Sequence, residues 1–209
     1  MNSITAKEFD VFEAEVVERD SRVTVVAREG GEEFRAHLRN TGRLEDLIYP
    51  GASVVCHWKE GGKTDARLIG AVDNGSYVLL DTHVQEKVFA VALRAGGVNP
   101  LPSIKSVEEQ ASCRGKRFDY GIRTARGFGY LELKSAVTCK EGWASYPDAP
   151  SQRGLEHVEI LTEMATEGGN SYVAFVVTHP DCDKFRPNRK VHPEMAEALM
   201  EARDSGVEL

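Results

Sequence analysis

Hydrophobic and polar residues alternate in several short runs over residues 11–82 of the chain. Alternation with a period of two is typical of β-strands that bury one face. The runs are bounded by glycine, asparagine or aspartate and cover residues 11–18, 22–29, 33–40, 53–58, 66–72 and 76–82. The turn centres between them are Gly30-Gly31, Pro50-Gly51, Gly61-Gly62 and Asn74-Gly75. Five or six short, evenly spaced strands predict a small closed or partly closed β-barrel.

A helical pattern follows the predicted strands. Apolar residues recur at helical spacing from His83 to Leu93, and the pattern ends at Gly96-Gly97. The proline-containing segment 99–103 is typical of a linker. The sequence therefore predicts a barrel over residues 1–82, a connecting helix and linker over 83–100, and a second domain over 101–209.

The second domain mixes helical and strand patterns. Helices are predicted over residues 106–112, 152–166 and 193–204, the last followed by Gly206 as its C′ residue. Strands are predicted over residues 117–122, 128–138 and 171–179, and residues 140–154 have no regular pattern. The order helix, strand, strand, helix, strand, helix is typical of an α/β domain. The predicted fold class is an all-β barrel followed by an α/β domain.

Two charged residues interrupt an apolar strand pattern in the segment GYLELKSAV, residues 129–137. Glu132 and Lys134 lie two apart, so they share one face of that strand. This strand and the one before it read as a hairpin over residues 117–134. A symmetric turn would place Asp119 directly opposite Glu132. Opposed carboxylates repel one another and destabilise a sheet. A divalent cation between them would offset the repulsion, and Mg²⁺ prefers carboxylate, water and phosphate oxygens.

This residue set suggests phosphodiester hydrolysis. A metal held by Asp119 and Glu132 would polarise a phosphoryl group and acidify a bound water. Lys134 would steady the phosphate or orient the attacking water. A simple ion pair between Glu132 and Lys134 on an edge strand is the alternative interpretation, and the sequence leaves both open.

Composition and charge limit the function classes. The net charge of −7 argues against a globally basic nucleic-acid binder but allows a local basic face. The apolar runs are too short to span a bilayer, and the first residues do not read as a secretion signal, so a cytoplasmic location is expected. The four cysteines are widely spaced and expected to be reduced, with zinc binding or a disulfide as the alternative; they are Cys56, Cys113, Cys139 and Cys182.

Several segments together closely resemble the sugar fermentation stimulation protein family. They are AHLRNTGRLEDLIYPGASV, RGKRFDYGI, YLELKSAV, YPDAPSQRGLEHVEIL and FVVTHPDCDKFRPNRKVHPEMAEAL. The resemblance runs from roughly Phe9 to Leu209. It implies an N-terminal OB-like β-barrel and a C-terminal domain like the PD-(D/E)XK nucleases. It also implies DNA binding without strong sequence preference and a regulatory role in sugar (maltose) metabolism.

The nuclease-like pattern of the family corresponds to Asp119, Glu132 and Lys134, the residues that the hairpin pattern selects. Asp148, Arg153 and His157 match the pattern after the core strand. Arg153 and His157 are four residues apart and share one helix face, from which they would bind phosphate or orient a metal-bound water. A surface arginine and a histidine bonded to a neighbouring glutamate is the alternative.

One position departs from the nuclease pattern. Members of this fold often add an acidic ligand from the helix that precedes the hairpin. Glu108 and Glu109 are candidates here, but Gln110 occupies the matching spacing. The resemblance therefore leaves this ligand open, and Mg²⁺ or Mn²⁺ at Asp119 and Glu132 is a hypothesis.

Several cations are candidates for DNA contacts. Arg35, His37 and Arg39 alternate along one predicted strand and share a face, with Arg43 in the turn that follows. The other candidate DNA-binding cations are Arg114, Lys116, Arg117 and Arg186. OB barrels hold single strands with a basic groove and stacked aromatic rings, for which Trp58, Trp143 and Tyr146 are candidates. A solvated strand face is the alternative for the first group.

Three functional hypotheses follow. The first is a DNA-binding protein with a Mg²⁺-dependent nuclease-like site. The second is a non-catalytic DNA-binding regulator of sugar metabolism that retains the nuclease-like fold. The third is a small-molecule or nucleotide binder that uses the barrel. Salt-sensitive DNA retention separates the first two from the third, and cleavage with a divalent metal separates the first from the second.

Overall fold

The computed structural model describes residues 10–98, 101 and 103–209. The predicted linker, residues 99–103, lies partly outside them. The chain forms two compact units. The first comprises residues up to Val88 together with Ala136–Asp148 and Val177–Arg186, and the second comprises Phe89–Ser135, Ala149–Val176 and Pro187–Leu209. Among the described residues, no helix is long and apolar enough to cross a membrane.

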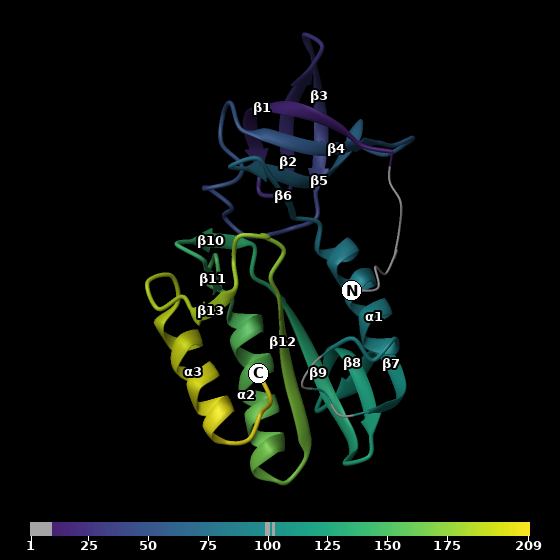
Figure 1. Cartoon of the computed structure of the whole chain (residues 1–209), viewed down its shortest axis with the longest axis vertical. Helices are drawn as coiled ribbons and strands as arrows, with labels where there is room; N and C mark the ends of the chain where they lie inside the picture. Colours follow the sequence, from purple (N-terminus) through teal and green to yellow (C-terminus); the bar gives the residue numbers. More distant parts are fainter. Residues whose placement is uncertain (1–9, 99–100, 102) are drawn as a thin grey trace. The chain divides into compact units, whose positions relative to one another are not determined.

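Six strands of the first unit form a sheet that closes into a barrel (Figure 1). They are β1 (Phe12–Ser21), β2 (Thr24–Glu29), β3 (Glu32–Leu38), β4 (Ser53–Trp58), β5 (Ala66–Asp73) and β6 (Ser76–Leu79). Their order is β3-β2-β1-β4-β5-β6, and parallel pairing of β3 with β5 closes the barrel. Buried residues alternate with more exposed ones, as in Phe34, Ala36 and Leu38 of β3. The predicted strands and barrel are confirmed.

Glycine is required at two kinds of position in the barrel. Gly30, Gly51 and Gly75 have positive φ in the predicted turns, a conformation that glycine adopts without steric cost. Gly70 lies within β5, where a Cβ would be 2.5 Å from the carbonyl oxygen of Val78. Close pairing of β5 with β6 therefore depends on the absence of a side chain at Gly70.

The second unit has a four-stranded sheet with helices on both faces (Figure 1). In spatial order the strands are β12 (Asn170–Val176), β9 (Gly127–Ser135), β8 (Lys116–Thr124) and β7 (Ile104–Cys113), and β12 runs parallel to β9. Helix α2 (Gln152–Thr166) covers one face and α3 (Pro193–Asp204) packs against α2. The second half of α1 (Thr82–Arg94) packs on the opposite face, where Ala90 and Leu93 contact a core cluster. The predicted α/β class is confirmed.

The segment predicted as a helix over residues 106–112 is part of strand β7 instead. Its glutamates, glutamine and alanine favour a helix by intrinsic propensity. Antiparallel pairing with β8, from Ile104↔Thr124 to Cys113↔Lys116, satisfies the backbone of this segment and overrides that preference. Because β7 is an edge strand, most of its polar side chains remain exposed.

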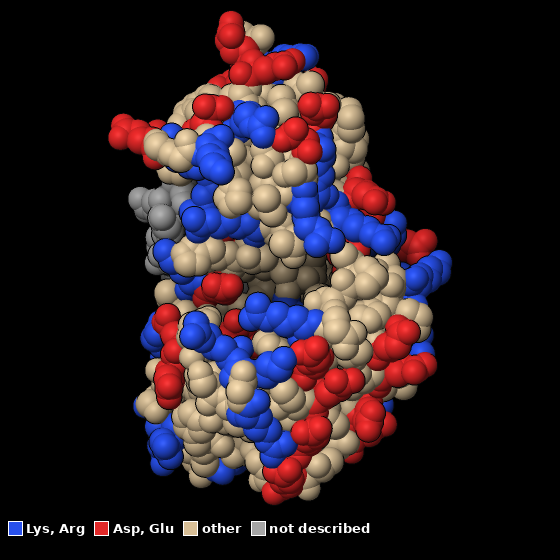
Figure 2. Space-filling model, turned by 180° about the vertical axis from the view of Figure 1, so that it is seen from behind, with Lys and Arg blue, Asp and Glu red and all other residues tan. Residues whose placement is uncertain are grey.

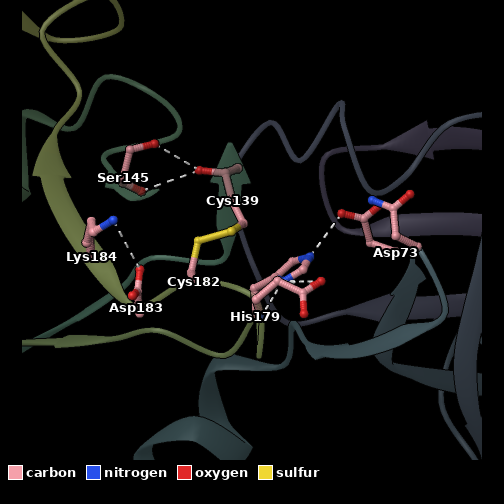
Figure 3. Close-up of a disulfide and its surroundings, with 10 residues drawn as sticks. Asp73, Cys139, Ser145, His179, Cys182, Asp183 and Lys184 are labelled. Carbon is pink, nitrogen blue, oxygen red and sulfur yellow. Dashed lines mark hydrogen bonds and ion pairs between the residues drawn. A yellow bond between two sulfur atoms is a disulfide. The ribbon is translucent and has the colours of Figure 1, made fainter. Parts of the chain in front are cut away.

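Residues 140–154, which have no regular pattern in the sequence, contribute to a small three-stranded sheet. Its strands are β10 (Thr138–Lys140), β11 (Trp143–Tyr146) and β13 (Lys184–Pro187), in the order β10-β11-β13. A disulfide joins Cys139 to Cys182, two residues before β13 (Figure 3). The prediction of four reduced cysteines is therefore wrong for this pair. The partners are 43 residues apart, so no short spacing motif signals them.

Removal of this disulfide is expected to destabilise the protein. The bond closes a loop with a sequence separation of 43, which restricts the unfolded chain. The Cys139→Ser, Cys182→Ser double variant is expected to lower the free energy of unfolding by about 2–4 kcal/mol. Urea denaturation measures this, with Cys113→Ser as a control because Cys113 is a free thiol. A double variant as stable as the control would contradict the expectation.

Candidate functional site

Glu132 and Lys134 lie together on one buried face of β9. Their side chains are each 8% exposed, and Nζ of Lys134 donates a hydrogen bond to Oε1 of Glu132 at 2.8 Å. Leu131 points to the opposite face and joins the cluster that α1 covers. β9 lies between β12 and β8, so the pair is inside the sheet rather than on an edge strand. The edge-strand part of the alternative interpretation is therefore wrong, whereas the ion pair between Glu132 and Lys134 that it predicts is present.

Asp119 reaches the same stretch of β9 from the neighbouring strand. The hairpin register runs from Thr124↔Gly127 to Tyr120↔Leu131, which is the symmetric turn that the sequence suggests. Asp119 is the next residue, and its Oδ2 accepts a hydrogen bond from the backbone N–H of Leu133 at 2.7 Å. Leu133 separates Glu132 from Lys134 in the sequence, so the carboxylate of Asp119 lies beside that segment of β9.

His157 approaches Glu132 from α2. Ser151 caps this helix by accepting a hydrogen bond from the N–H of Gly154, which fixes where the helix begins. Nδ1 of His157 lies 2.7 Å from Oε1 of Glu132, and the side chain is 3% exposed. This contact has the distance of an ion pair but not the alignment of a hydrogen bond. The ring of Phe118 packs against the imidazole with 5.2 Å between centroids.

The electrostatic environment favours an ionised Glu132. Burial alone would raise its pKa, but the neighbouring His157 and Lys134 outweigh that effect, so the pKa of Glu132 is lowered from its usual value. Both neighbours contact Oε1. The second oxygen, Oε2, is buried and accepts no hydrogen bond from the described residues. A buried, ionised oxygen without a donor is a position where a cation fits.

The negative charge of Glu132 can be tested by measuring protein stability at low pH. A carboxylate with a lowered pKa in the folded protein contributes stability above its ordinary pKa of about 4.3, and that stability is lost as pH falls through the folded value. The free energy of unfolding should therefore decrease below about pH 4.3. In Glu132→Gln that decrease should be smaller, because the substituted side chain does not titrate. Urea unfolding at a series of pH values measures both proteins, and identical acid dependence would contradict the prediction.

The described residues include no group of three or more His, Cys, Asp and Glu side chains with metal-ligand geometry. The carboxylates of Asp119 and Glu132 both lie beside the same segment of β9. Mg²⁺ is commonly bound by one or two carboxylates, with water and phosphate oxygens as its other ligands. The residue set therefore fits Mg²⁺ or Mn²⁺ with few protein ligands and does not fit a closed all-protein cage.

Other residues selected from the sequence lie in different surroundings. Arg153 is exposed in the first turn of α2, one helical turn before His157, and pairs with no carboxylate among the described residues. Glu108 and Glu109 lie on edge strand β7 and not on a helix. Glu109 forms an ion pair with Arg94 of α1. The helix predicted over residues 106–112 is strand β7, so neither glutamate is presented from a helix.

Asp148 belongs to the first unit and has a structural partner there. Its Oδ2 accepts a hydrogen bond from the backbone N–H of Leu44 at 2.6 Å. A Cβ at Gly42 would lie 2.8 Å from the same oxygen, so the close approach requires glycine. The motifs NTGR and PDA, far apart in the sequence, therefore meet in this loop. Asp148 fixes the conformation of the loop over residues 40–44.

The candidate DNA-binding cations divide into two groups. Arg35 pairs with Asp20, Arg114 with Glu163 and Glu167, and Lys116 with Glu156. Among the described residues, no carboxylate pairs with the remaining four, Arg39, Arg43, Arg117 and Arg186. The alternation of Arg35, His37 and Arg39 with buried neighbours is confirmed. Figure 2 shows acidic and basic side chains beside one another over much of one face, with several acidic ones together at its lower right.

Two features of the site were not predicted from the sequence. Phe118 is fully buried and forms part of the surroundings of His157. Glu156 precedes His157 and pairs with Lys116, which links α2 to β8. Phe118 directly precedes Asp119 in the sequence. Its position next to the candidate acid was the one sequence signal that could have identified Phe118 as part of the site. The partner of Lys116 had no comparable signal, because it depends on how α2 docks on the sheet.

Two family models match the chain. Residues 83–209 match the sugar fermentation stimulation protein RE domain, and residues 17–80 match the SfsA N-terminal OB domain. A sugar fermentation stimulation protein homolog of Pyrococcus furiosus is 35% identical over 175 residues, which cover 84% of this chain and 76% of the relative. A homolog of the same description from Chloroflexus aurantiacus is 33% identical over 201 residues, covering 95% and 78%.

A solved structure is similar over almost the whole chain. The structure of Pyrococcus furiosus SfsA in complex with Ca²⁺ has a TM-score of 0.91 and 32% sequence identity. The match covers 99% of this chain and 90% of that chain. The comparison supports an OB barrel followed by an α/β domain, as the strands and helices described above indicate.

Proposed function

Because the chain belongs to the sugar fermentation stimulation protein family, we propose that it binds DNA without strong sequence preference and hydrolyses phosphodiester bonds at Glu132. The C-terminal domain then acts as a PD-(D/E)XK nuclease-like domain, with Mg²⁺ or Mn²⁺ as cofactor. The observation that carries this proposal is the convergence of Asp119, Glu132 and Lys134 on one segment of β9. The buried Oε2 of Glu132, with no donor among the described residues, supports a cation there.

Each residue of the site has a chemical role in this proposal. Asp119 and Glu132 hold the metal, which when bound polarises a phosphoryl oxygen and lowers the pKa of a water ligand. Lys134 places a positive charge where a pentavalent phosphate develops negative charge. His157 holds the orientation of Glu132 through the contact at Oε1. Arg153, exposed at the start of the same helix, contributes a phosphate contact.

DNA binding rests on the fold of the first unit and on unpaired cations. OB folds bind single-stranded nucleic acids through a basic groove and aromatic rings. Arg39 and Arg43 are exposed at the end of β3 and in the loop that follows, without carboxylate partners among the described residues. The Pyrococcus furiosus SfsA structure is a complex with Ca²⁺, and this supports the proposal that the present chain also binds a divalent cation.

A second candidate function is a non-catalytic DNA-binding regulator of sugar (maltose) metabolism. One observation favours it: Lys134 and His157 both contact Oε1 of Glu132, so this oxygen already has two nitrogen neighbours from the chain itself. Among the described residues, no group of three or more His, Cys, Asp and Glu side chains could hold a metal ion. In this alternative Glu132, Lys134 and His157 form a buried structural network, and DNA retention does not depend on a metal.

One experiment separates the two functions. The purified protein is incubated with plasmid and with single-stranded DNA, with Mn²⁺, with Mg²⁺ and with a chelator. Cleavage that requires the metal is the result expected for the nuclease. Salt-sensitive retention without cleavage under any condition would favour the regulator. Absence of retention at low salt would contradict both.

A further inference from the structure

The small sheet β10-β11-β13 of the first unit has one polar face. Lys140 pairs with Trp143 in the β10–β11 register, so these two side chains share a face. Lys184 and Arg186 lie two apart on β13, where both are exposed. Two cations, Lys184 and Arg186, therefore lie beside the indole ring, and a third, Lys140, shares its face of the sheet.

Contacts between the cations and the ring define the face. Nζ of Lys184 lies 5.7 Å from the centroid of Trp143, and Cζ of Arg186 lies 5.6 Å from it. Both distances are in the range of cation–π interactions. Trp143 is half-buried, so part of its ring is accessible. An indole with cations at this spacing is a surface suited to a ligand that joins neutral aromatic rings to negatively charged groups.

The charges of these cations are only partly neutralised. Arg186 pairs with no carboxylate in the described part of the chain. Lys184 is 3.9 Å from Asp183, and both side chains are more than half exposed. Lys140 is 3.0 Å from Asp46 in a pair that is also exposed. Exposed pairs of this kind contribute little stability, so phosphate groups can replace the carboxylates at low cost.

The disulfide fixes the opposite face of the same sheet. Cys139 is opposite Ala144 in the β10–β11 register, one residue from the Lys140–Trp143 pair, so it points away from the polar face. Its partner Cys182 precedes Lys184 by two residues (Figure 3). The segment that carries Lys184 and Arg186 is thereby attached to β10, which limits how far the cations move from Trp143.

We propose that this face, defined by Lys140, Trp143, Lys184 and Arg186, binds single-stranded nucleic acid, with an unpaired base stacked on Trp143 and phosphates held by the cations. This inference rests on the DNA binding proposed above and names the strandedness and the contact surface. An unpaired base has an exposed π-face for stacking, whereas a duplex keeps its bases stacked on one another. The surface shares no residue with the Glu132 site, and its strands are not among the barrel strands β1–β6.

Tryptophan fluorescence tests the stacking directly, because the chain has only two tryptophans, Trp58 and Trp143. In Trp58→Phe the remaining emission comes from Trp143. Addition of oligo(dT) under non-reducing conditions is expected to quench that emission, and a duplex of equal length is expected to quench it much less. Quenching by the duplex at equal concentration would overturn the assignment to single strands.

Binding of labelled oligo(dT), measured by fluorescence anisotropy, provides the second readout. Trp143→Leu is expected to weaken binding by about 5- to 150-fold, the range for loss of one stacked base. Arg186→Gln is expected to reduce the slope of log K against log salt by about 0.7. Arg203→Gln is the charge-matched control, because Arg203 is exposed on α3 and pairs with Asp204. Circular dichroism confirms that each variant is folded.

The outcomes distinguish this inference from the proposed function. Wild-type binding to oligo(dT) with unchanged affinity in Trp143→Leu and Arg186→Gln would overturn the surface and leave DNA binding intact. Absence of binding by the wild type to any nucleic acid would overturn both. Weaker binding in these two variants, with the control unchanged, supports the surface.

Discussion

Glu132→Gln is expected to lower metal-dependent DNA cleavage by at least about a thousandfold. The substitution keeps the shape of the side chain and removes its charge. Lys134 still has an oxygen to donate to, but the buried Oε2 or its replacement amide no longer attracts a cation. Initial rates of plasmid nicking at saturating Mn²⁺ measure the loss. Glu159→Gln is the matched control, because Glu159 is exposed on the same helix as His157.

Asp119→Asn separates the metal role from the structural role. The carboxylate of Asp119 accepts a hydrogen bond from the N–H of Leu133, and an asparagine carbonyl oxygen can accept the same bond. The variant is therefore expected to keep most of its stability and to lose cleavage to a similar extent as Glu132→Gln. Full cleavage by both variants would contradict a metal site at these residues. Loss of folding in Asp119→Asn would identify the carboxylate as structural.

The hairpin of the site was predictable because its information is local. Strand alternation places Glu132 and Lys134 on one face, and a symmetric turn at residues 124–127 sets the register of the hairpin up to Tyr120. The observed register, Thr124↔Gly127 through Tyr120↔Leu131, follows that symmetry. The bounds of α2 and α3 were predictable for the same reason, since apolar spacing and end signals lie within each helix.

Features that depend on distant segments were not predictable from local patterns. β7 is a strand because β8 pairs with it, although its own composition favours a helix. Cys139 and Cys182 meet only after β12 returns the chain to the first unit. The same limit applies to charge, since residue spacing does not reveal that carboxylates of α2 neutralise Arg114 and Lys116.

Burial also changed the interpretation of single residues. His157 was selected as a residue that faces phosphate or water, on the same helix face as Arg153. The structure buries His157 against Glu132 and leaves Arg153 exposed, so the two side chains occupy different environments. A shared helix face predicts direction but not depth, because depth depends on how closely the helix packs on the sheet. We therefore infer that His157 is a positioning residue for Glu132.

Phe118→Ala is expected to destabilise the second unit more than any other single truncation considered for the site. Phe118 is fully buried, and its ring lies 5.6 Å from that of Tyr130 and 5.2 Å from that of His157. Truncation removes the aromatic ring and leaves a cavity between β8 and α2, at a cost of about 3–5 kcal/mol in the free energy of unfolding. Urea denaturation measures this cost.

The same variant also tests how His157 is held. Phe118→Leu retains most of the apolar volume and is the matched control, with an expected cost below about 1.5 kcal/mol if the neighbours repack. Without the phenyl ring the imidazole has space to rotate away from Oε1 of Glu132, so cleavage by the folded fraction of Phe118→Ala should decrease as well. A stable Phe118→Ala protein with wild-type cleavage would show that neither α2 nor the orientation of His157 depends on this contact.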